Sequence, residues 1–175
     1  YLFLNEDDKK YLPDHNKIKY VITNERPTYF LFFNFANELE TEENIIICNS
    51  DIHFDETLSL LKDIDMTNRF YALNRYDDDV LYDVPFSQDA WIFKKGLILD
   101  ESFFKLGTLG CDNKICYLAI MSGLVIYNPS KVVKSHHIHR DKSRNYIGKI
   151  EGPYGLTEPN DDPNKVSFMR IINSF

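Results

Sequence analysis

Ile45-Ile46-Ile47-Cys48-Asn49-Ser50-Asp51 is the stretch of sequence that decides the fold. Its first four residues form an unbroken apolar run, mostly β-branched, which is the pattern of a strand buried on both faces in a parallel sheet. The run ends abruptly in three polar residues. Because ligands collect beyond the carboxyl ends of strands in an open α/β sheet, we expect residues 49–51 to lie at a ligand site.

Segments of helical and extended pattern alternate around this strand. An aromatic-rich helix is expected over residues 28–39, and Asp55 can cap another that contains Leu58, Leu60 and Leu61. A third helix is expected over residues 112–122, closed by Gly123. Further strands are predicted at residues 1–4, 17–22, 69–73, 91–93, 96–99 and 124–127.

This alternation predicts a single α/β domain over residues 1–175, with a mostly parallel, Rossmann-like sheet flanked by helices. Residues 147–175 are rich in charge, Asn, Gly and Pro, and they predict an irregular tail. A short final strand or helix is expected within that tail at residues 166–172.

Composition restricts the class of protein. The chain has 20 Lys and Arg against 27 Asp and Glu, a net charge of −7, so no general nucleic-acid partner is expected. The longest uncharged apolar runs are about half the roughly 20 residues that cross a bilayer, so we expect no membrane span and a cytoplasmic location. The three cysteines are predicted to be reduced and structural.

Two segments carry candidate metal ligands. Asp51 follows the buried strand and suits Mg²⁺ or Mn²⁺, although an ordinary Asx turn explains residues 49–51 equally well. In extended chain His137 and His139 point to one side, opposite His136 and Ile138. A solvated strand end is the alternative for these histidines. Basic residues follow them and suit a phosphate-bearing ligand, namely Arg140, Lys142, Arg144 and Lys149.

Two carboxylates are candidate general bases. Asp89 precedes an apolar strand, and Asp112 follows Gly107 and Gly110, which leave room for a ligand to approach. The simpler interpretation of Asp112 is the N-cap of its helix.

Five motifs together resemble the nucleotide-sugar-dependent glycosyltransferases of the GT-A fold, and in particular a group of uncharacterised GT-A-like proteins. The resemblance covers about residues 1–146, and the motifs occur in the expected order. They are Arg26-Pro27-Thr28, the DxD-like segment 49–55, Ser87-Gln88-Asp89-Ala90-Trp91-Ile92-Phe93, Gly110-Cys111-Asp112-Asn113 and the histidine segment 137–146.

This resemblance implies roles for individual residues. Asp51 would bind the divalent cation that bridges the donor diphosphate, with His137 or His139 completing the metal or diphosphate site. Asp112 would be the general base of an inverting enzyme, with Asp89 as the second candidate. Asn49 replaces the usual first acid of the DxD motif. The remaining donor-binding candidates are Arg26, Asn49, Ser50 and Arg144. The first strand and helix of the family fold would precede Tyr1, so we expect them to be missing.

The expected function is therefore metal-dependent transfer of a sugar, with inversion, from a nucleoside diphosphate donor to a hydroxyl. A UDP-sugar with Mn²⁺ or Mg²⁺ is the expected donor, and the acceptor is a glycan, a lipid-linked or a protein-linked hydroxyl. Two alternatives remain: a sugar- or nucleotide-binding module without turnover, and a metal-dependent phosphohydrolase or nuclease. Acceptor specificity is expected in residues 76–86 and after residue 150.

Overall fold

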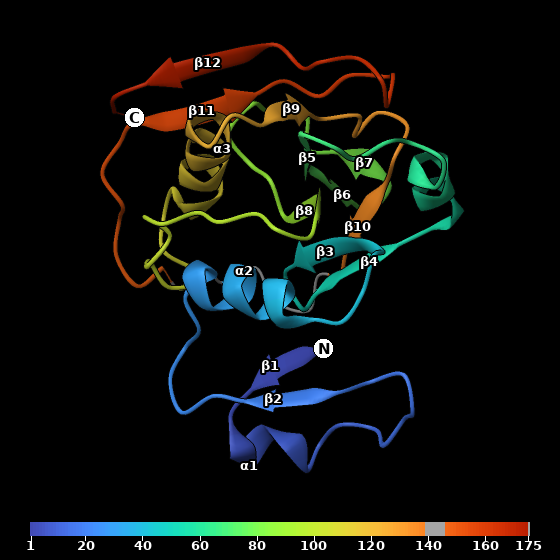
Figure 1. Cartoon of the computed structure of the whole chain (residues 1–175), viewed down its shortest axis with the longest axis vertical. Helices are drawn as coiled ribbons and strands as arrows, with labels where there is room; N and C mark the ends of the chain where they lie inside the picture. The colour runs from blue at the N-terminus through green and yellow to red at the C-terminus, as the bar shows by residue number, and fades with distance from the viewer. Residues whose placement is uncertain (139–145, 175) are drawn as a thin grey trace.

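The main sheet has four strands in the order β3-β8-β5-β9 (Figure 1). The computed structural model describes residues 1–138 and 146–174, so the predicted site residues His139 and Arg144 lie outside it. β8 (Ala90–Lys94) is antiparallel to both of its neighbours, β3 (Asn44–Cys48) and β5 (Arg69–Leu73). Only the pairing of β5 with β9 (Val125–Tyr127) is parallel in this sheet.

The prediction of a mostly parallel, Rossmann-like sheet is therefore wrong. Most strand pairs are antiparallel or belong to mixed sheets, and helix makes up only 19% of the chain. The apolar run in β3 belongs to an edge strand in which Ile45 is buried and Ile46 is 37% exposed. The strands buried on both faces are the two inner ones, β8 and β5, and an apolar run has the same composition whether its strand pairs in a parallel or an antiparallel way.

Helix α2 (Tyr29–Glu38) is apolar on more than one face because it packs between two sheets (Figure 1). Thr28 caps it, with Oγ1 accepting from the Leu31 amide at 3.2 Å. Phe33 points into the main core, and the ring of Phe32 lies edge-on to Phe3 with centroids 4.8 Å apart. Phe3 belongs to a parallel two-stranded sheet made of β1 (Leu2–Leu4) and β2 (Tyr20–Ile22), with the short helix α1 (Glu6–Lys9) after β1.

Helix α3 (Cys111–Met121) packs between the main sheet and a C-terminal hairpin. The hairpin consists of β11 (Tyr154–Thr157) and β12 (Met169–Ile172), so residues 147–174 are more regular than predicted. Gly155 allows the close approach, because a Cβ there would lie 2.8 Å from the Tyr117 backbone nitrogen.

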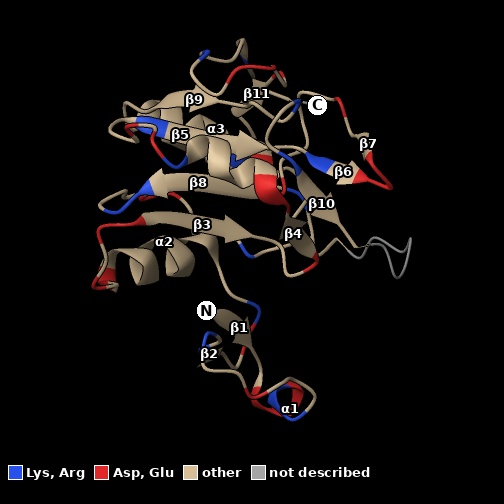
Figure 2. Cartoon of the chain, turned by 90° about the vertical axis from the view of Figure 1, so that its right-hand side faces the viewer, with Lys and Arg blue, Asp and Glu red and all other residues tan. Residues whose placement is uncertain are grey.

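A second sheet, with the strand order β4-β10-β6-β7, carries His53, His136 and His137 (Figure 2). Its strands are β4 (Ile52–Phe54), β10 (Ser135–His137), β6 (Arg75–Asp77) and β7 (Val80–Leu81). Asp55 caps the 3₁₀ helix η1 (Glu56–Leu61) as predicted, accepting from the Thr57 amide at 3.0 Å. Residues 96–99 form no strand.

The helices are short. α2 has 10 residues and α3 has 11, against the roughly 20 that a helical membrane span needs. In the described part of the chain, no helix combines the length and apolarity of a membrane span.

Candidate functional site

The antiparallel β8 brings three polar segments to one edge of the main sheet. Cys48 at the end of β3 and Leu73 at the end of β5 both pair with Ala90, the first residue of β8. The ladder continues one residue further, because the Asn49 amide donates to the Asp89 carbonyl oxygen at 3.2 Å. The residues that follow β3 and β5 therefore meet those that precede β8.

A cavity of about 980 Å³ opens at this edge, and the first turn of α3 forms part of its wall. It gathers all of the predicted site residues that the structure describes. Those that line it are Arg26, Asn49, Ser50, Asp51, Asp89, Asp112 and His137. Its wall also contains aromatic and polar residues, namely Tyr29, Arg75, Tyr82, Phe86, Gln88, Trp91, Lys149 and Tyr154.

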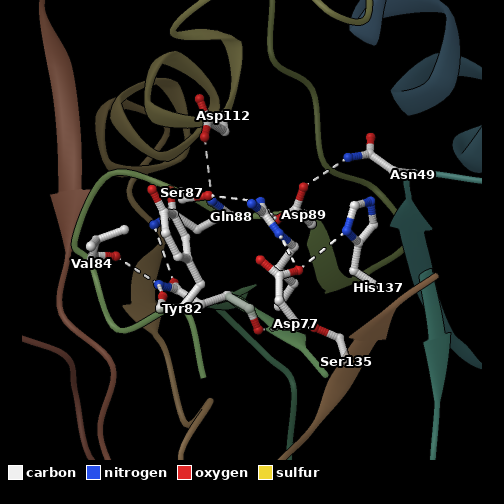
Figure 3. A network of polar contacts seen from close by, with 12 residues as sticks. Asn49, Asp77, Tyr82, Val84, Ser87, Gln88, Asp89, Asp112, Ser135 and His137 are labelled. Atoms are coloured by element: carbon white, nitrogen blue, oxygen red, sulfur yellow. Dashed lines mark hydrogen bonds and ion pairs between the residues drawn. The ribbon is translucent and has the colours of Figure 1, made fainter. Parts of the chain in front are cut away.

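Asp89 is held on both carboxylate oxygens. Arg75 Nη1 donates to Asp89 Oδ2 at 2.9 Å, and Asn49 Nδ2 donates to Asp89 Oδ1 at 2.9 Å. Arg75 Nε also binds Asp77 Oδ1 at 2.9 Å, and the Arg75 side chain is only 8% exposed. Figure 3 shows Asp89 directed toward Asn49 in this network. These contacts suit a structural carboxylate better than a base that must accept a proton.

Asp112 lies in the first turn of α3 and is reached from the cavity. Burial of its carboxyl group raises the pKa to about 7, and the negative charge of Asp89 adds to this effect. Asp112 Oδ2 accepts a hydrogen bond from the backbone amide of Gln88 at 3.3 Å, a contact drawn in Figure 3. A carboxyl group that titrates near neutral pH can both bind and release a proton, as a general base must.

The N-cap of α3 is Gly110, so the prediction of Asp112 as N-cap is wrong. Gly110 has a φ of +84°, a conformation that side chains rarely adopt, and a Cβ there would lie 2.9 Å from the Tyr154 ring. This left-handed residue places Asp112 inside the helix, beside the cavity.

Asp51 lies in the turn before β4, His137 is the last residue of the neighbouring strand β10, and the two meet at the cavity. His137 Nε2 lies 2.9 Å from Asp51 Oδ2. His137 Nδ1 lies 3.2 Å from Asp77 Oδ1, a contact drawn in Figure 3. β10 pairs with β4 on one side and with β6 on the other, which explains why its histidine has a carboxylate at each ring nitrogen.

The alternation predicted for the histidines is confirmed for the described pair. His136 points away from His137, contacts Asp55 Oδ2 at 3.0 Å and stacks on His53 with ring centroids 5.1 Å apart. Ile138 is 50% exposed and does not pack into the core.

A metal at this position would have few protein ligands. In residues 1–138 and 146–174, no three His, Cys, Asp or Glu side chains are arranged to hold an ion. Asp51 and His137 offer one oxygen and one nitrogen. Mg²⁺ keeps several waters and is often bound by one or two carboxylates plus substrate phosphates, so this pair fits a metal that is completed by a substrate.

Arginine and lysine supply positive charge on the cavity wall. Arg26 Nη1 donates to the Leu106 carbonyl oxygen at 3.2 Å, which holds the guanidinium beside Gly107. Lys149 lies in the segment that pairs with Leu109. A second hollow of about 590 Å³ shares Arg26 and Ser50 with the cavity and extends past the carboxyl ends of β1 and β2.

Arg75 and Asp77 are the residues that the sequence prediction missed. Alternate residues of a strand share one face, so the pattern Arg75-Tyr76-Asp77 could have suggested an ion pair. Their position against Asp89 and His137 could not be predicted, because it depends on how the two sheets meet.

Comparison with known proteins adds no assignment to this geometry. No family model matches the chain, and no curated protein and no solved structure shows significant similarity to it. The residues of the cavity are therefore the basis for inferring a function.

Proposed function

We propose that this cavity transfers a glycosyl group, with inversion, from a nucleoside diphosphate sugar to a hydroxyl acceptor, with Mn²⁺ or Mg²⁺ as cofactor. The observation that carries the proposal is the position of Asp112: a carboxyl group with a pKa of about 7 lines the same cavity as the Asp51–His137 pair. A base and a metal-ligand pair around one cavity supply the two activities that this reaction needs. The order of motifs supports the same function, with a UDP-sugar as the expected donor.

Asp51 and His137 would hold the metal. When bound, the ion would supply charge stabilisation for the departing diphosphate. Asp77 contacts the other nitrogen of His137 and would keep the imidazole oriented toward the cavity. His139 remains a proposed third ligand outside the described residues.

Asp112 would accept the proton of the acceptor hydroxyl. The hydroxyl oxygen then forms a bond to the anomeric carbon of the donor, and the bond from that carbon to the diphosphate oxygen breaks. Positive charge from Arg26 and Lys149 would stabilise the leaving diphosphate, with Arg144 as a further proposed ligand. The second hollow, which meets the cavity at Arg26, offers space for the nucleoside.

The acceptor would enter beside the segment that follows β7. Tyr82 and Phe86 of this segment line the cavity. Asn74 fixes the segment, because its Nδ2 donates to the Tyr82 carbonyl oxygen at 2.8 Å and to the Val84 carbonyl oxygen at 2.6 Å. These contacts support the expectation that residues 76–86 help to select a glycan, lipid-linked or protein-linked hydroxyl.

Turnover tests the proposal directly. Purified protein would be incubated with Mn²⁺ and with UDP-glucose, UDP-galactose or UDP-N-acetylglucosamine, and release of UDP would be measured with and without candidate acceptors. Thermal shifts with UDP, in the presence and absence of Mn²⁺, report binding separately. Mn²⁺-dependent binding without any turnover would favour the alternative of a binding module. No binding and no turnover would overturn both.

A further inference from the structure

Trp91 carries a buried hydrogen-bond donor that the fold leaves without a partner. The residue is 1% exposed, and its Nε1 contacts no acceptor in residues 1–138 and 146–174. The great majority of buried polar side-chain atoms are hydrogen-bonded, since an unpaired buried donor loses its water without compensation. This indole N–H therefore needs an explanation.

The surroundings of Trp91 within the sheet offer no acceptor side chain. Its register partners are Ile47 on β3 and Ala72 on β5, both apolar. The ring of Tyr29 lies edge-on to the indole with centroids 5.4 Å apart, and the Tyr29 hydroxyl is instead 3.5 Å from Cys111 Sγ. The indole N–H therefore lacks a partner because of where Trp91 lies on β8.

Trp91 lines the main cavity, and this distinguishes it from the second buried side-chain atom that has no partner within residues 1–138 and 146–174. That second group is Thr157 Oγ1, on the hairpin strand β11, and Thr157 is not among the residues that line the cavity. Trp91 thus borders the space that a ligand would fill, whereas Thr157 does not. The chemistry at the cavity end of β8 therefore points to a ligand atom as the missing acceptor.

We propose that the Trp91 indole N–H donates a hydrogen bond to an oxygen of a sugar bound in the cavity. An indole N–H is a donor only, so it selects an acceptor oxygen, whereas the carboxyl group of Asp112 can accept from a hydroxyl. Sugar hydroxyls both donate and accept, so they match this pair. The inference rests on the proposed function in one respect, that the sugar belongs to a nucleotide donor or to a glycan acceptor.

The chain contains one tryptophan, so the indole has a single N–H resonance in ¹⁵N-labelled protein. The first arm of the experiment adds UDP with Mn²⁺, and the second adds UDP-glucose, UDP-galactose or UDP-N-acetylglucosamine with Mn²⁺. The third adds free glucose, galactose or N-acetylglucosamine, alone and with UDP present. A downfield shift of the indole proton in the second arm identifies the donor sugar, and a shift in the third arm alone identifies the acceptor.

Trp91→Phe removes the N–H and keeps an aromatic ring. We expect it to weaken binding of the sugar-bearing ligand by roughly 3- to 10-fold, the range of one hydrogen bond, while binding of UDP is unchanged. Phe93→Leu is the matched control, because Phe93 lies on the same strand and the same face, is 1% exposed and has no polar atom. It should leave both affinities unchanged.

Two results overturn the inference and can be told apart from failure of the proposed function. If UDP-sugars bind while the indole resonance stays in place and Trp91→Phe keeps full affinity, the Trp91 contact is wrong and the proposed function stands. If no nucleotide binds with Mn²⁺, the proposed function fails. In that case the free sugars decide, and an unmoved indole resonance with all of them overturns the Trp91 contact as well.

Discussion

Arg75 Nη1 lies 2.9 Å from Asp89 Oδ2, and this buried ion pair separates the roles of the two candidate bases that line the cavity, Asp89 and Asp112. Asp89 is bound to the guanidinium of Arg75 and to the side-chain amide of Asn49. Asp112 is bound to a backbone amide, and its pKa is raised to about 7. We therefore infer that Asp89 stabilises the fold, whereas Asp112 takes part in proton transfer.

Asp89→Asn should destabilise the fold. Removing one partner of a buried pair leaves the other charge uncompensated, and because Arg75 keeps Asp77 we expect a loss of about 3 kcal/mol in the free energy of unfolding, at the low end of such changes. Urea denaturation measures it. The control is Glu25→Gln, which breaks the exposed Glu25–Lys105 pair and should change stability little. Equal stability of both variants would refute the structural role of Asp89.

Asp112→Asn should lower turnover by at least about 10²-fold while nucleotide binding survives, because removing a general base typically costs 10²–10⁴ in rate. The wild-type kcat/KM should rise with pH through about 7 and then level off, since only the ionised carboxylate accepts a proton. Steady-state kinetics from pH 5 to 9 would show it. The assignment would pass to Asp89 if Asp112→Asn kept normal turnover and Asp89→Asn lost it. A product that retains the anomeric configuration of the donor would exclude the base role for both.

Asp112 should also make stability depend on pH. Its pKa is raised in the folded state from an ordinary 3.8 to about 7, so the folded protein holds the proton more tightly than the unfolded chain. The stability of the wild type relative to Asp112→Asn should therefore fall as pH rises from about 4 to about 7, and stay constant above. Urea denaturation at several pH values tests this, with the exposed Asp100→Asn as a control that follows the wild type.

Asp51→Asn should abolish Mn²⁺-dependent nucleotide binding and leave the melting temperature of the ligand-free protein nearly unchanged, because the Asp51 side chain is 49% exposed. A bound ligand at 100 times its Kd stabilises the folded state by about 2.7 kcal/mol, so thermal shift detects the difference readily. The variant Asp100→Asn again serves as the control. Metal-dependent binding that persists in Asp51→Asn would remove Asp51 from the site.

His137→Ala should weaken Mn²⁺-dependent nucleotide binding by about 10-fold or more, since loss of a ligand costs at least as much as loss of a residue that orients one. His136→Ala is the matched control, because His136 lies on the opposite side of the same strand. In crystals soaked with Mn²⁺, His137 Nε2 should lie roughly 2 Å from the ion. An ion more than about 8 Å from His137 would contradict the assignment, since even a water-bridged contact is shorter.

Local signals in the sequence predicted the positions of helices and strands better than they predicted how the strands pair. The aromatic helix expected over residues 28–39 is confirmed, as is the Asp55 cap, because both depend on neighbouring residues. Strand direction depends on contacts between distant segments, and an apolar run is the same in a parallel or an antiparallel sheet. Asp51 and Asp112 could be found from the polar residues beside apolar segments, whereas the contacts of Arg75 and Asp77 arise only when two sheets meet.

The antiparallel register of β8 has a consequence for how this chain can change in length. Ala90 pairs with both Cys48 and Leu73, so a residue inserted or deleted within β8 would exchange the faces of Trp91 and Ile92. The same change would withdraw Asp89 from Arg75. Insertions at Asp78 and Asp79, in the turn between β6 and β7, leave this register intact. Related chains should therefore differ in length at that turn and keep the spacing from Ser87 to Phe93.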